Sequence, residues 1–358
     1  MSAASTPAVD AVIQPGRKRD LGTAPLTWIR SRTLGNSWPA GAIVLAVVAL
    51  LLAQSVIPEG TQSLLATAFL YVALAQSWNL IGGITGYASF GQVVFYGVGA
   101  YTTAVMMTHY HIGFWWTVPA AVAVGVVLAL IAGLPLLRLK GHYFAIATLG
   151  LATGVGEIVN NLGALTGGGT GVTIPVFGKA AATAYPGDSA FYLYFVLIAA
   201  VTVAFMLVLS RSRFGFAMRA IHQDEDAAAA VGINTTWVKV AAFALSGAIA
   251  AAAGAFSGFK TIQFYPSDVF DASITVQMVI MVLIGGSGSI VGPIVGAVGL
   301  TLLNNFLQTA LPGHSLLIFG AIIVLVVVLF PQGVIGFISD SWKQRRLSLL
   351  DNVRRHRL

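Results

Sequence analysis

The chain alternates between long apolar runs and short polar stretches. Lipid offers the backbone no hydrogen bonds, so apolar runs of about twenty residues indicate helices that cross a membrane. The runs lack the alternating polar positions that line a membrane barrel, which excludes a barrel. We therefore predict an all-α integral membrane protein, a polytopic bundle of about ten transmembrane helices. The predicted spans are residues 39–57, 64–83, 86–108, 114–137, 142–160, 191–209, 238–258, 274–286, 290–311 and 315–335.

Composition narrows the chemistry. Hydrophobic residues make up 57% of the 358 residues and charged residues 9%, with a mean hydropathy of +0.86. The chain has no cysteine, which excludes disulfides, thiolate metal sites and cysteine nucleophiles. It contains no Gly-x-x-x-x-Gly-Lys-Ser/Thr phosphate loop, no His-Glu-x-x-His pair and no Gly-x-Ser-x-Gly elbow. We predict that the chain is not an enzyme and binds neither a cofactor nor a metal.

Basic residues are placed unevenly between the spans. With a cytoplasmic N-terminus, 17 of the 19 Lys and Arg residues fall inside, and only Lys179 and Lys260 fall outside, as the positive-inside rule requires. We predict two cytoplasmic termini, a basic tail at 1–38, a transmembrane domain at 39–338 and a second basic tail at 339–358. Positive-inside charge also explains the pI near 9.8, so we predict no nucleic-acid partner. The first tail can equally bind anionic membrane lipid.

The densest group of charges lies in the predicted cytoplasmic loop 210–239. Residues 216–230 lack Pro and Gly and are rich in Ala, so they favour one helix, with its acidic residues in the middle. Gly232 is typical of a helix end. We predict that the loop docks onto a partner in water, although charges solvated near lipid head groups are the alternative. The charged residues are Arg211, Arg213, Arg219, Asp224, Glu225, Asp226 and Lys239.

Glycines with adjacent serines interrupt the apolar runs at 82–91 and 285–289. Paired interruptions point to irregular backbone that lines a cavity, whereas tight helix packing is the simpler explanation for any single glycine. The spacing of Gly288, Gly292 and Gly296 predicts a close backbone approach on one helix face. We predict that the translocation path is lined by Gly86, Ser89, Gly91, Gln92, Gly285, Gly286, Ser287, Gly288 and Asn304.

Few polar residues lie within the spans. Their amides either contact an uncharged or zwitterionic cargo or join helix to helix, and both remain open. An ionisable residue in a span is a functional candidate by default, but Glu157 lies near the outer end, where a hydrated interface explains it as well. The polar residues are Gln76, Asn79, Gln92, Glu157, Asn160, Gln277, Asn304 and Asn305.

Two longer segments, 161–190 and 259–273, lie on the predicted outer side. Each mixes glycines or aromatic residues with a few charges. A long loop beside a membrane is usually either functional or disordered, and we favour functional contact for both. We predict contact with an outer partner through Thr166, Gly168, Thr170, Tyr265 and Asp268.

Several motifs follow one another after residue 60: Gly86-Tyr-Ala-Ser-Phe-Gly-Gln92, Gly97-Val-Gly-Ala-Tyr101, Leu137-Arg-Leu-Lys-Gly-His-Tyr-Phe144, Ala147-Thr-Leu-Gly150, Leu165-Thr-Gly-Gly-Gly-Thr-Gly171, Arg213-Phe-Gly215 and Gly285-Gly-Ser-Gly-Ser-Ile-Val-Gly-Pro293. In this order they resemble the membrane-spanning permease subunits of bacterial ABC importers for branched-chain and other hydrophobic amino acids. Asp226-Ala-Ala-x-x-x-Gly232 resembles the Glu-Ala-Ala-x-x-x-Gly coupling signature of such permeases, with Asp in place of Glu. The resemblance implies coupling to an ATPase through Arg219, Asp224, Glu225, Asp226, Ala227, Ala228 and Gly232.

The resemblance also implies a type II-like importer permease in the bacterial inner membrane. Its partners would be a second homologous permease, two cytoplasmic ATPase subunits that hold ATP and Mg, and a periplasmic substrate-binding protein at the two outer segments. Similar permeases serve branched-chain and other amino acids, urea, amides or aromatic acids, so the cargo stays open. A secondary transporter is the further alternative, but it needs ion-coupling groups within the spans, and only Glu157 offers one.

Overall fold

The computed structural model describes residues 54, 57–176, 183–329 and 333–335. All of them belong to one of two compact units, residues 40–358. The predicted tails 1–38 and 339–358 lie outside the described residues, as does the predicted span 39–57 apart from residues 54 and 57. So does Lys179, one of the two basic residues expected on the outer side.

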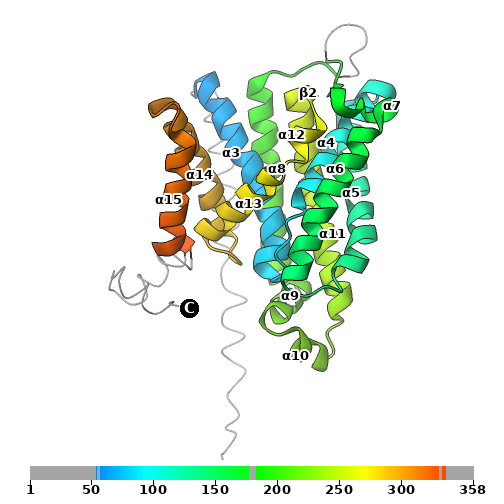
Figure 1. Ribbon diagram of the computed structural model, residues 1–358, viewed down its shortest axis with the longest axis vertical. Helices are drawn as coiled ribbons and strands as arrows, with labels where there is room; N and C mark the ends of the chain where they lie inside the picture. Colours follow the sequence, from blue (N-terminus) through cyan, green and yellow to red (C-terminus); the bar gives the residue numbers. More distant parts are fainter. Residues whose placement is uncertain (1–53, 55–56, 177–182, 330–332, 336–358) are drawn as a thin grey trace, which may run out of the picture. The chain divides into compact units, whose positions relative to one another are not determined.

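Nearly all of the described chain is helical (Figure 1). We call the end that carries α9 and α10 the lower end and the end that carries the two short strands the upper end, as in Figure 1. The elements are α3 Glu59–Trp78, the π-helix η1 Asn79–Ile84, α4 Gln92–His109, α5 Phe114–Leu136, α6 His142–Asn161, α7 Gly163–Thr166, the 3₁₀-helix η2 Gly168–Thr170, β1 Val172–Thr173, α8 Asp188–Arg211, α9 Arg213–Gln223, α10 Glu225–Ala230, α11 Thr235–Thr261, β2 Gln263–Phe264, α12 Pro266–Val269, α13 Ala272–Gly285, α14 Val291–Ala310 and α15 Ser315–Leu329.

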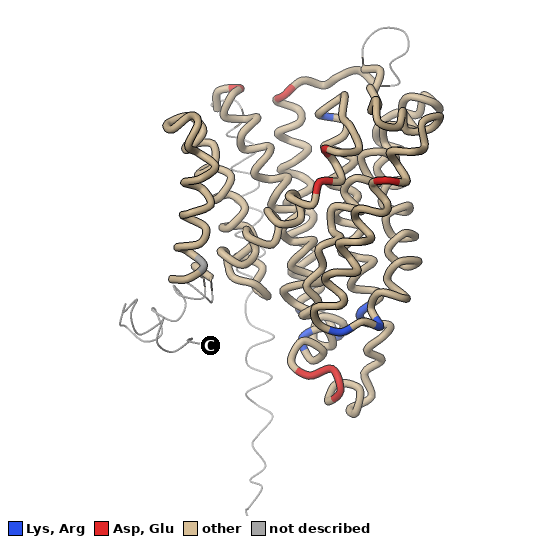
Figure 2. The backbone as a smooth tube through the Cα atoms, viewed as in Figure 1, with Lys and Arg blue, Asp and Glu red and all other residues tan. Residues whose placement is uncertain are grey.

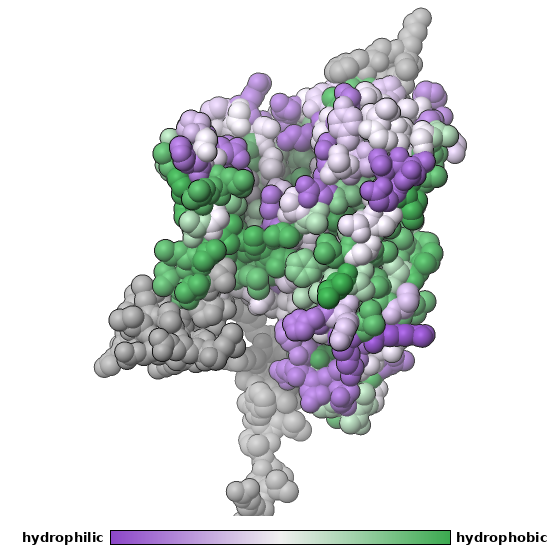
Figure 3. Space-filling view, viewed as in Figure 1, coloured by the Kyte–Doolittle hydropathy of each residue, from purple (hydrophilic) through white to green (hydrophobic). Residues whose placement is uncertain are grey.

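Seven of these helical stretches are long and apolar enough to cross a membrane. They confirm the prediction of a polytopic all-α membrane protein. Two further helices, α4 and the shorter α15, lie in the predicted segments 86–108 and 315–335 but are not among the seven. Figure 3 shows a hydrophobic band across the visible face, between hydrophilic residues at the two ends. The seven stretches are Glu59–Ile84, Phe114–Leu136, His142–Asn161, Asp188–Arg211, Thr235–Thr261, Pro266–Gly285 and Val291–Ala310.

The long helix α11 forms the centre of the bundle and packs along α4 and α5. Glycines allow this contact: a Cβ at Gly99 of α4 would collide with the carbonyl oxygen of Ala251, and a Cβ at Gly254 of α11 with that of Tyr96. Helices in lipid associate through such close backbone contacts, because apolar side chains gain little by leaving lipid.

The predicted helix 86–108 begins later than expected, at Gln92. Residues 85–91 are not helical, because Gly86 has a φ of +85° and the chain turns there. The Trp78 indole donates a hydrogen bond to the Ser89 carbonyl at 2.7 Å, which fastens the segment to the end of α3. Before the turn, α3 passes into the wider π-helix η1, a feature that is often found at functional sites.

Candidate functional site

The predicted coupling loop forms two short helices at the lower end of the bundle (Figure 1). The expected single helix 216–230 is wrong, since the backbone is extended at Asp224, with φ −161° and ψ 111°, and α10 starts there. The Asp224 carboxylate accepts hydrogen bonds from the Asp226 and Ala227 amides, each at 2.9 Å. These amides lack carbonyl partners at the start of α10, and an Asp at this position satisfies them. The cap therefore favours two helices over one.

α10 ends at Ala230, and Gly232 terminates it two residues further on, as expected. Gly232 has a φ of +90°, a conformation that glycine adopts at little cost. Its amide donates to the Ala229 carbonyl at 3.0 Å, and the Ile233 amide donates to the Ala228 carbonyl at 3.1 Å. This pair of hydrogen bonds is a Schellman motif. No atom lies within 4 Å of a Cβ placed at Gly232, so the need for glycine comes from the backbone conformation.

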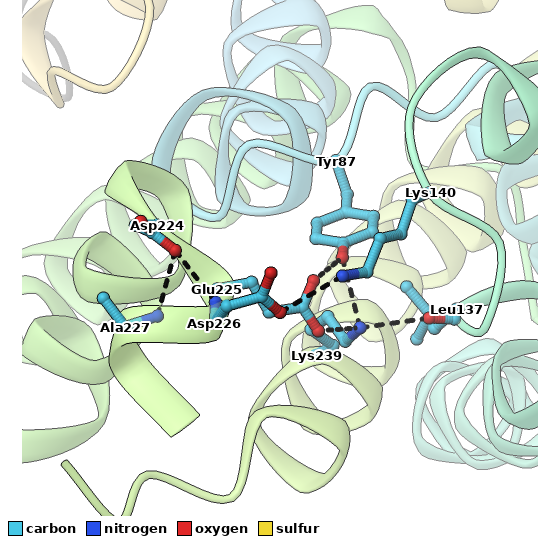
Figure 4. A network of polar contacts seen from close by, with 8 residues as sticks. All are labelled: Tyr87, Leu137, Lys140, Asp224, Glu225, Asp226, Ala227 and Lys239. Carbon is cyan, nitrogen blue, oxygen red and sulfur yellow. Dashed lines mark hydrogen bonds and ion pairs between the residues drawn. The ribbon is translucent and has the colours of Figure 1, made fainter. Parts of the chain in front are cut away.

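Glu225 turns inward from α10 into a polar network (Figure 4). Its carboxylate lies 2.6 Å from Lys239 Nζ and accepts a hydrogen bond from the Tyr87 hydroxyl. Lys239 Nζ also donates to the Tyr87 hydroxyl and to the Leu137 carbonyl, each at 3.1 Å. An ammonium group has three N–H donors, and all three have acceptors here. Only 6% of the Lys239 side chain and 18% of the Glu225 side chain are exposed.

This Lys239 network, formed by Tyr87, Leu137, Glu225 and Lys239, joins four parts of the bundle. Tyr87 belongs to the non-helical segment before α4, Leu137 ends α5, Glu225 begins α10, and Lys239 lies in α11. A cation beside the last carbonyls of α5 also interacts favourably with the dipole of that helix. Because an unpaired buried charge is costly, the network fastens α10 to the bundle.

The same contacts determine the protonation of Glu225 and Tyr87. Burial raises the pKa of the Glu225 carboxyl, but hydrogen bonds from Lys239 and Tyr87 and the charges of Lys239 and Lys140 outweigh it, so the pKa is lowered. Burial first, and then the hydrogen bond and charge of Glu225, raise the pKa of Tyr87 well above its usual value. At neutral pH the carboxylate is therefore ionised and the phenol keeps the proton that it donates.

The other predicted coupling residues lie mostly on the outside of α9 and α10. Ala228 is buried. The Arg219 guanidinium lies 5.8 Å from the centre of the Phe216 ring. Asp226 pairs with Lys140 at 3.3 Å, but both side chains are largely exposed, so the pair holds α10 only weakly. The exposed residues are Arg219, Asp224, Asp226 and Ala227. Figure 2 shows acidic and basic residues of the described chain gathered at this end.

The two glycine-rich segments lie against each other. The Asn79 side chain donates to the Ser289 carbonyl at 2.8 Å and accepts from the Gly288 amide at 2.9 Å. A Cβ at Gly83 would lie 2.7 Å from the Gly288 nitrogen. Gly286 has a φ of +118° and Gly288 one of +72°, while Ser287 is exposed. The segments thus meet through backbone and a single amide side chain.

Three predicted path residues near α4 make contacts within the bundle. The Gln92 amide is buried and donates to the hydroxyls of Ser77, at 2.7 Å, and of Ser246. Ser89 is also fully buried. A Cβ at Gly91 would lie 2.6 Å from the Thr148 carbonyl oxygen of α6. At these positions the structure shows helix-to-helix contacts, one of the two roles that the sequence left open for the amides.

Gly285 and Asn304 lie on the pair α13 and α14. A Cβ at Gly285 would collide with the Gly292 backbone, and one at Gly296 with the Met281 carbonyl oxygen. Asn304, further along α14, lines two adjoining cavities. Glu157 is exposed on α6.

The two outer segments meet at the upper end. β1 pairs with β2 in antiparallel register, Val172 opposite Phe264. The Thr166 hydroxyl is buried and donates to the Val159 carbonyl at 2.6 Å, and Gly168 is buried beside it. These two positions shape the loop. The three predicted contact residues that are exposed are Thr170, Tyr265 and Asp268.

Sequence reasoning missed Tyr87 and Leu137 as partners of the coupling loop. Tyr87 lies 138 residues before Glu225, and no periodic pattern links them. One signal was available: Lys239 is the one charged residue of the predicted span 238–258, and a charge in such a place usually has a partner. The missed residues also include His222 of α9, whose ring Nδ1 lies 3.2 Å from the Ile84 carbonyl oxygen at the end of η1.

Comparison with known proteins agrees with this architecture. The family described as branched-chain amino acid transport system / permease component matches residues 60–327. No solved structure matches the chain.

Curated relatives match along most of the chain. The high-affinity branched-chain amino acid transport system permease protein LivM of Salmonella typhimurium is 29% identical over 310 residues, covering 80% of this chain and 72% of the relative. LivM of Escherichia coli gives the same identity and coverage. The permease protein LivH of Escherichia coli is 26% identical over 291 residues, covering 74% of this chain and 91% of that protein. The chain therefore belongs to the permease family of branched-chain amino acid transport systems.

Proposed function

We propose that this chain is the permease subunit of a bacterial ABC importer and forms, with a second homologous permease, the path for branched-chain or other hydrophobic amino acids. The observation that carries the proposal is the α9–α10 hairpin, an exposed pair of helices fastened to the bundle by the buried Glu225–Lys239 pair. Two relatives that match most of the chain, LivM and LivH, are by name permeases for branched-chain amino acids.

The hairpin is suited to transmit movement. In the proposed mechanism it sits in a groove of a cytoplasmic ATPase, with Arg219 and Asp226 in contact with that subunit. Glu225 faces the opposite way and is bonded to Tyr87, which follows the π-helix η1. A shift of α10 would therefore reach the glycine-rich segments, and alternation between inward and outward openings would follow. Such coupling requires two arrangements of the bundle.

The remaining partners follow from the two ends of the bundle. Arg138 and Lys140 lie between α5 and α6, Arg211 ends α8, and Arg213 and Arg219 belong to α9. We place this lower end in the cytoplasm with both termini. The upper end, where β1 and β2 join the outer segments, would receive a periplasmic substrate-binding protein at Thr170, Tyr265 and Asp268. ATP and Mg would be held by the two ATPase subunits.

A second permease needs an uncovered helix face. α6 offers one, because no atom lies within 4 Å of a Cβ placed at Gly150 or at Gly154 and Ile146 is 68% exposed. Two glycines four residues apart permit close approach of another helix. We place the contact with the second permease, or with lipid at its rim, on this face.

Uptake by intact cells tests the proposal. A bacterium that lacks its own branched-chain amino acid uptake would receive the chain with a second permease, ATPases and a binding protein. We expect accumulation of labelled leucine that requires this chain and stops when the ATPase phosphate loop is mutated. Leucine uptake that continues without a functional ATPase would favour a secondary transporter, and uptake of urea, amides or aromatic acids alone would favour a related permease.

A further inference from the structure

Two adjoining cavities lie between α3 and α14. One, of about 220 Å³, is enclosed by α3, α13, α14 and α15. The other, of about 350 Å³, lies between α3 and α14 towards Gly60 and Gln308, at the upper end. Both are lined by Thr67, Thr301 and Asn304, so they adjoin at these residues, and together they make up the space. The smaller cavity alone exceeds the roughly 30 Å³ share of a water molecule severalfold.

The polar groups around this space are hydroxyls and amides. Thr301 is 9% exposed, and its hydroxyl has no hydrogen-bond partner within the described part of the chain. A buried polar group without a partner is costly, so a ligand that bonds to this hydroxyl would be favoured here. The Asn304 oxygen accepts from Gln308 at 3.3 Å, which leaves its N–H groups to donate. The Thr67 hydroxyl donates to the Ser63 carbonyl at 3.0 Å, which leaves its oxygen to accept.

The two ends of the space differ in character. The inner end is lined by apolar side chains, among them Met281, Phe319 and Ile323. The upper end is lined by small and polar residues such as Gly60, Ser63 and Asn305. None of the lining residues in the described chain is charged. A charge carried into the apolar inner end would therefore be unpaired there, at high cost.

We infer that this space is a binding site for a small zwitterion with an aliphatic side chain. Hydroxyl and amide groups both donate and accept. The Asn304 N–H groups and the Thr301 hydroxyl can hold a carboxylate, and the Thr67 oxygen can accept from an ammonium group. The aliphatic part then lies against the apolar inner end. The inference rests on the proposed function, because it names the place on this chain where the transported amino acid is held.

The chain offers a direct test because it has no cysteine. Thr67→Cys places one thiol in the shared wall of the two cavities, and Asn305→Cys places one at the upper cavity. Thr309→Cys is the matched control, since Thr309 is exposed on α14 and lines neither cavity. The full chain in lipid nanodiscs is treated with a small methanethiosulfonate reagent, and the labelling rate is measured with and without L-leucine or L-lysine.

We expect L-leucine to slow labelling at position 67 or 305 and to leave position 309 unchanged. L-Lysine, which adds a net charge, should slow neither. Unchanged labelling at both cavity positions with L-leucine would overturn the site. Equal slowing by L-lysine would overturn the restriction to net-neutral ligands.

A second measurement separates this inference from the proposed function. In the assembled transporter we expect Thr301→Val to lower leucine uptake about tenfold, the factor that corresponds to about 1.4 kcal/mol, while Thr309→Val stays near wild type. The Thr309 hydroxyl bonds to its own helix at 2.9 Å and serves as the control for loss of a hydroxyl. Normal uptake with Thr301→Val would refute the site and leave the permease function intact. Protection of the thiol in a chain that supports no uptake would refute the transport function and leave the site.

Discussion

Lys239 Nζ lies 2.6 Å from the Glu225 carboxylate, inside the bundle rather than on the face that a partner would meet. The acidic residues 224–226 are adjacent in sequence, yet each has a different task. Asp224 caps α10, Glu225 fastens it to α11, and Asp226 is exposed. We therefore expect substitutions in this loop to affect stability and the proposed coupling separately.

Breaking the buried pair should destabilise the protein. Breaking a buried ion pair by removing one partner costs about 3–5 kcal/mol. We expect Lys239→Met or Glu225→Gln to lower the free energy of unfolding by an amount near the lower end of this range, because each leaves one partner without its opposite charge. The double variant should lose less than the sum of the two single losses. Thermal unfolding of the purified protein measures this, with the exposed pair Lys140→Met and Asp226→Asn as the control. Additive losses would contradict a coupled pair.

Exposed residues of the hairpin should behave in the opposite way. We expect Arg219→Ala and Asp226→Ala to leave the unfolding temperature unchanged, because both side chains are solvated. Uptake and substrate-stimulated ATP hydrolysis by the assembled complex should fall, since contacts within an interface matter more than solvated ones. Glu59→Gln, an exposed acid at the upper end, is the control. Wild-type coupling in both variants would argue against docking through this surface.

Alanine substitutions at two glycines should separate a glycine that is needed for close packing from one that tolerates a side chain. Gly91→Ala would place its methyl 2.6 Å from the Thr148 carbonyl oxygen, and overpacking of this kind typically costs about 1–3 kcal/mol. Gly150→Ala, also at a non-strained φ, meets open space and should not destabilise the protein. The unfolding temperatures of the two purified variants should therefore differ. Equal behaviour would show that the contact at Gly91 relaxes freely.

Acid should release α10 from the bundle. The Glu225 pKa is lowered from its ordinary 4.5, so its stabilising contribution is complete above about pH 4.5 and declines as the pH falls through the lowered value. Hydrogen exchange of the α10 amides should therefore be constant from neutral pH to about pH 5 and increase, after correction for the intrinsic rate, only below 4.5. Glu225→Gln should remove this acid step. A step near pH 6 would point to another group.

Topology is open to an independent test. The 17-to-2 distribution of basic residues predicts that both termini are cytoplasmic. Reporters that are active only in the cytoplasm or only in the periplasm, fused to each end of the full chain, should report cytoplasm at both. A periplasmic signal from either fusion would overturn the orientation and the placement of α9 and α10 with it.

The long apolar runs predicted the positions of the long helices well, but they predicted the irregular segments poorly. α5, α8 and α11 lie within a few residues of the predicted spans 114–137, 191–209 and 238–258, because continuous apolar runs in lipid have few alternatives to helix. The Gly232 cap was also predictable, since it depends on a single residue type. The break at Asp224 was not anticipated. The prediction rested on the helix propensity of a whole Ala-rich stretch, but the cap formed by the Asp224 side chain outweighs that propensity.

Long-range contacts were beyond any local pattern. The Tyr87 hydroxyl meets Lys239 across 152 positions of sequence, and only the packing of α4, α5 and α11 brings them together. The signature residues of the predicted coupling loop were chosen from their order in the sequence alone. The sequence did not show which of them face into the bundle. Which side chains face inward depends on the direction of α10 after Asp224, and this direction is determined by the packing of the neighbouring helices.

The position of Lys239 has a consequence for biosynthesis. Its three acceptors, in Tyr87, Leu137 and Glu225, all precede it in the chain. With the proposed orientation, a nascent chain would present the α9–α10 hairpin on the ribosome side of the membrane before the residue that anchors it has been made. Since domains form progressively during synthesis, a chain that stalls before residue 239 would present a loose hairpin with an uncompensated Glu225. Membrane quality-control proteases would have an unfastened loop to cut until α11 is inserted.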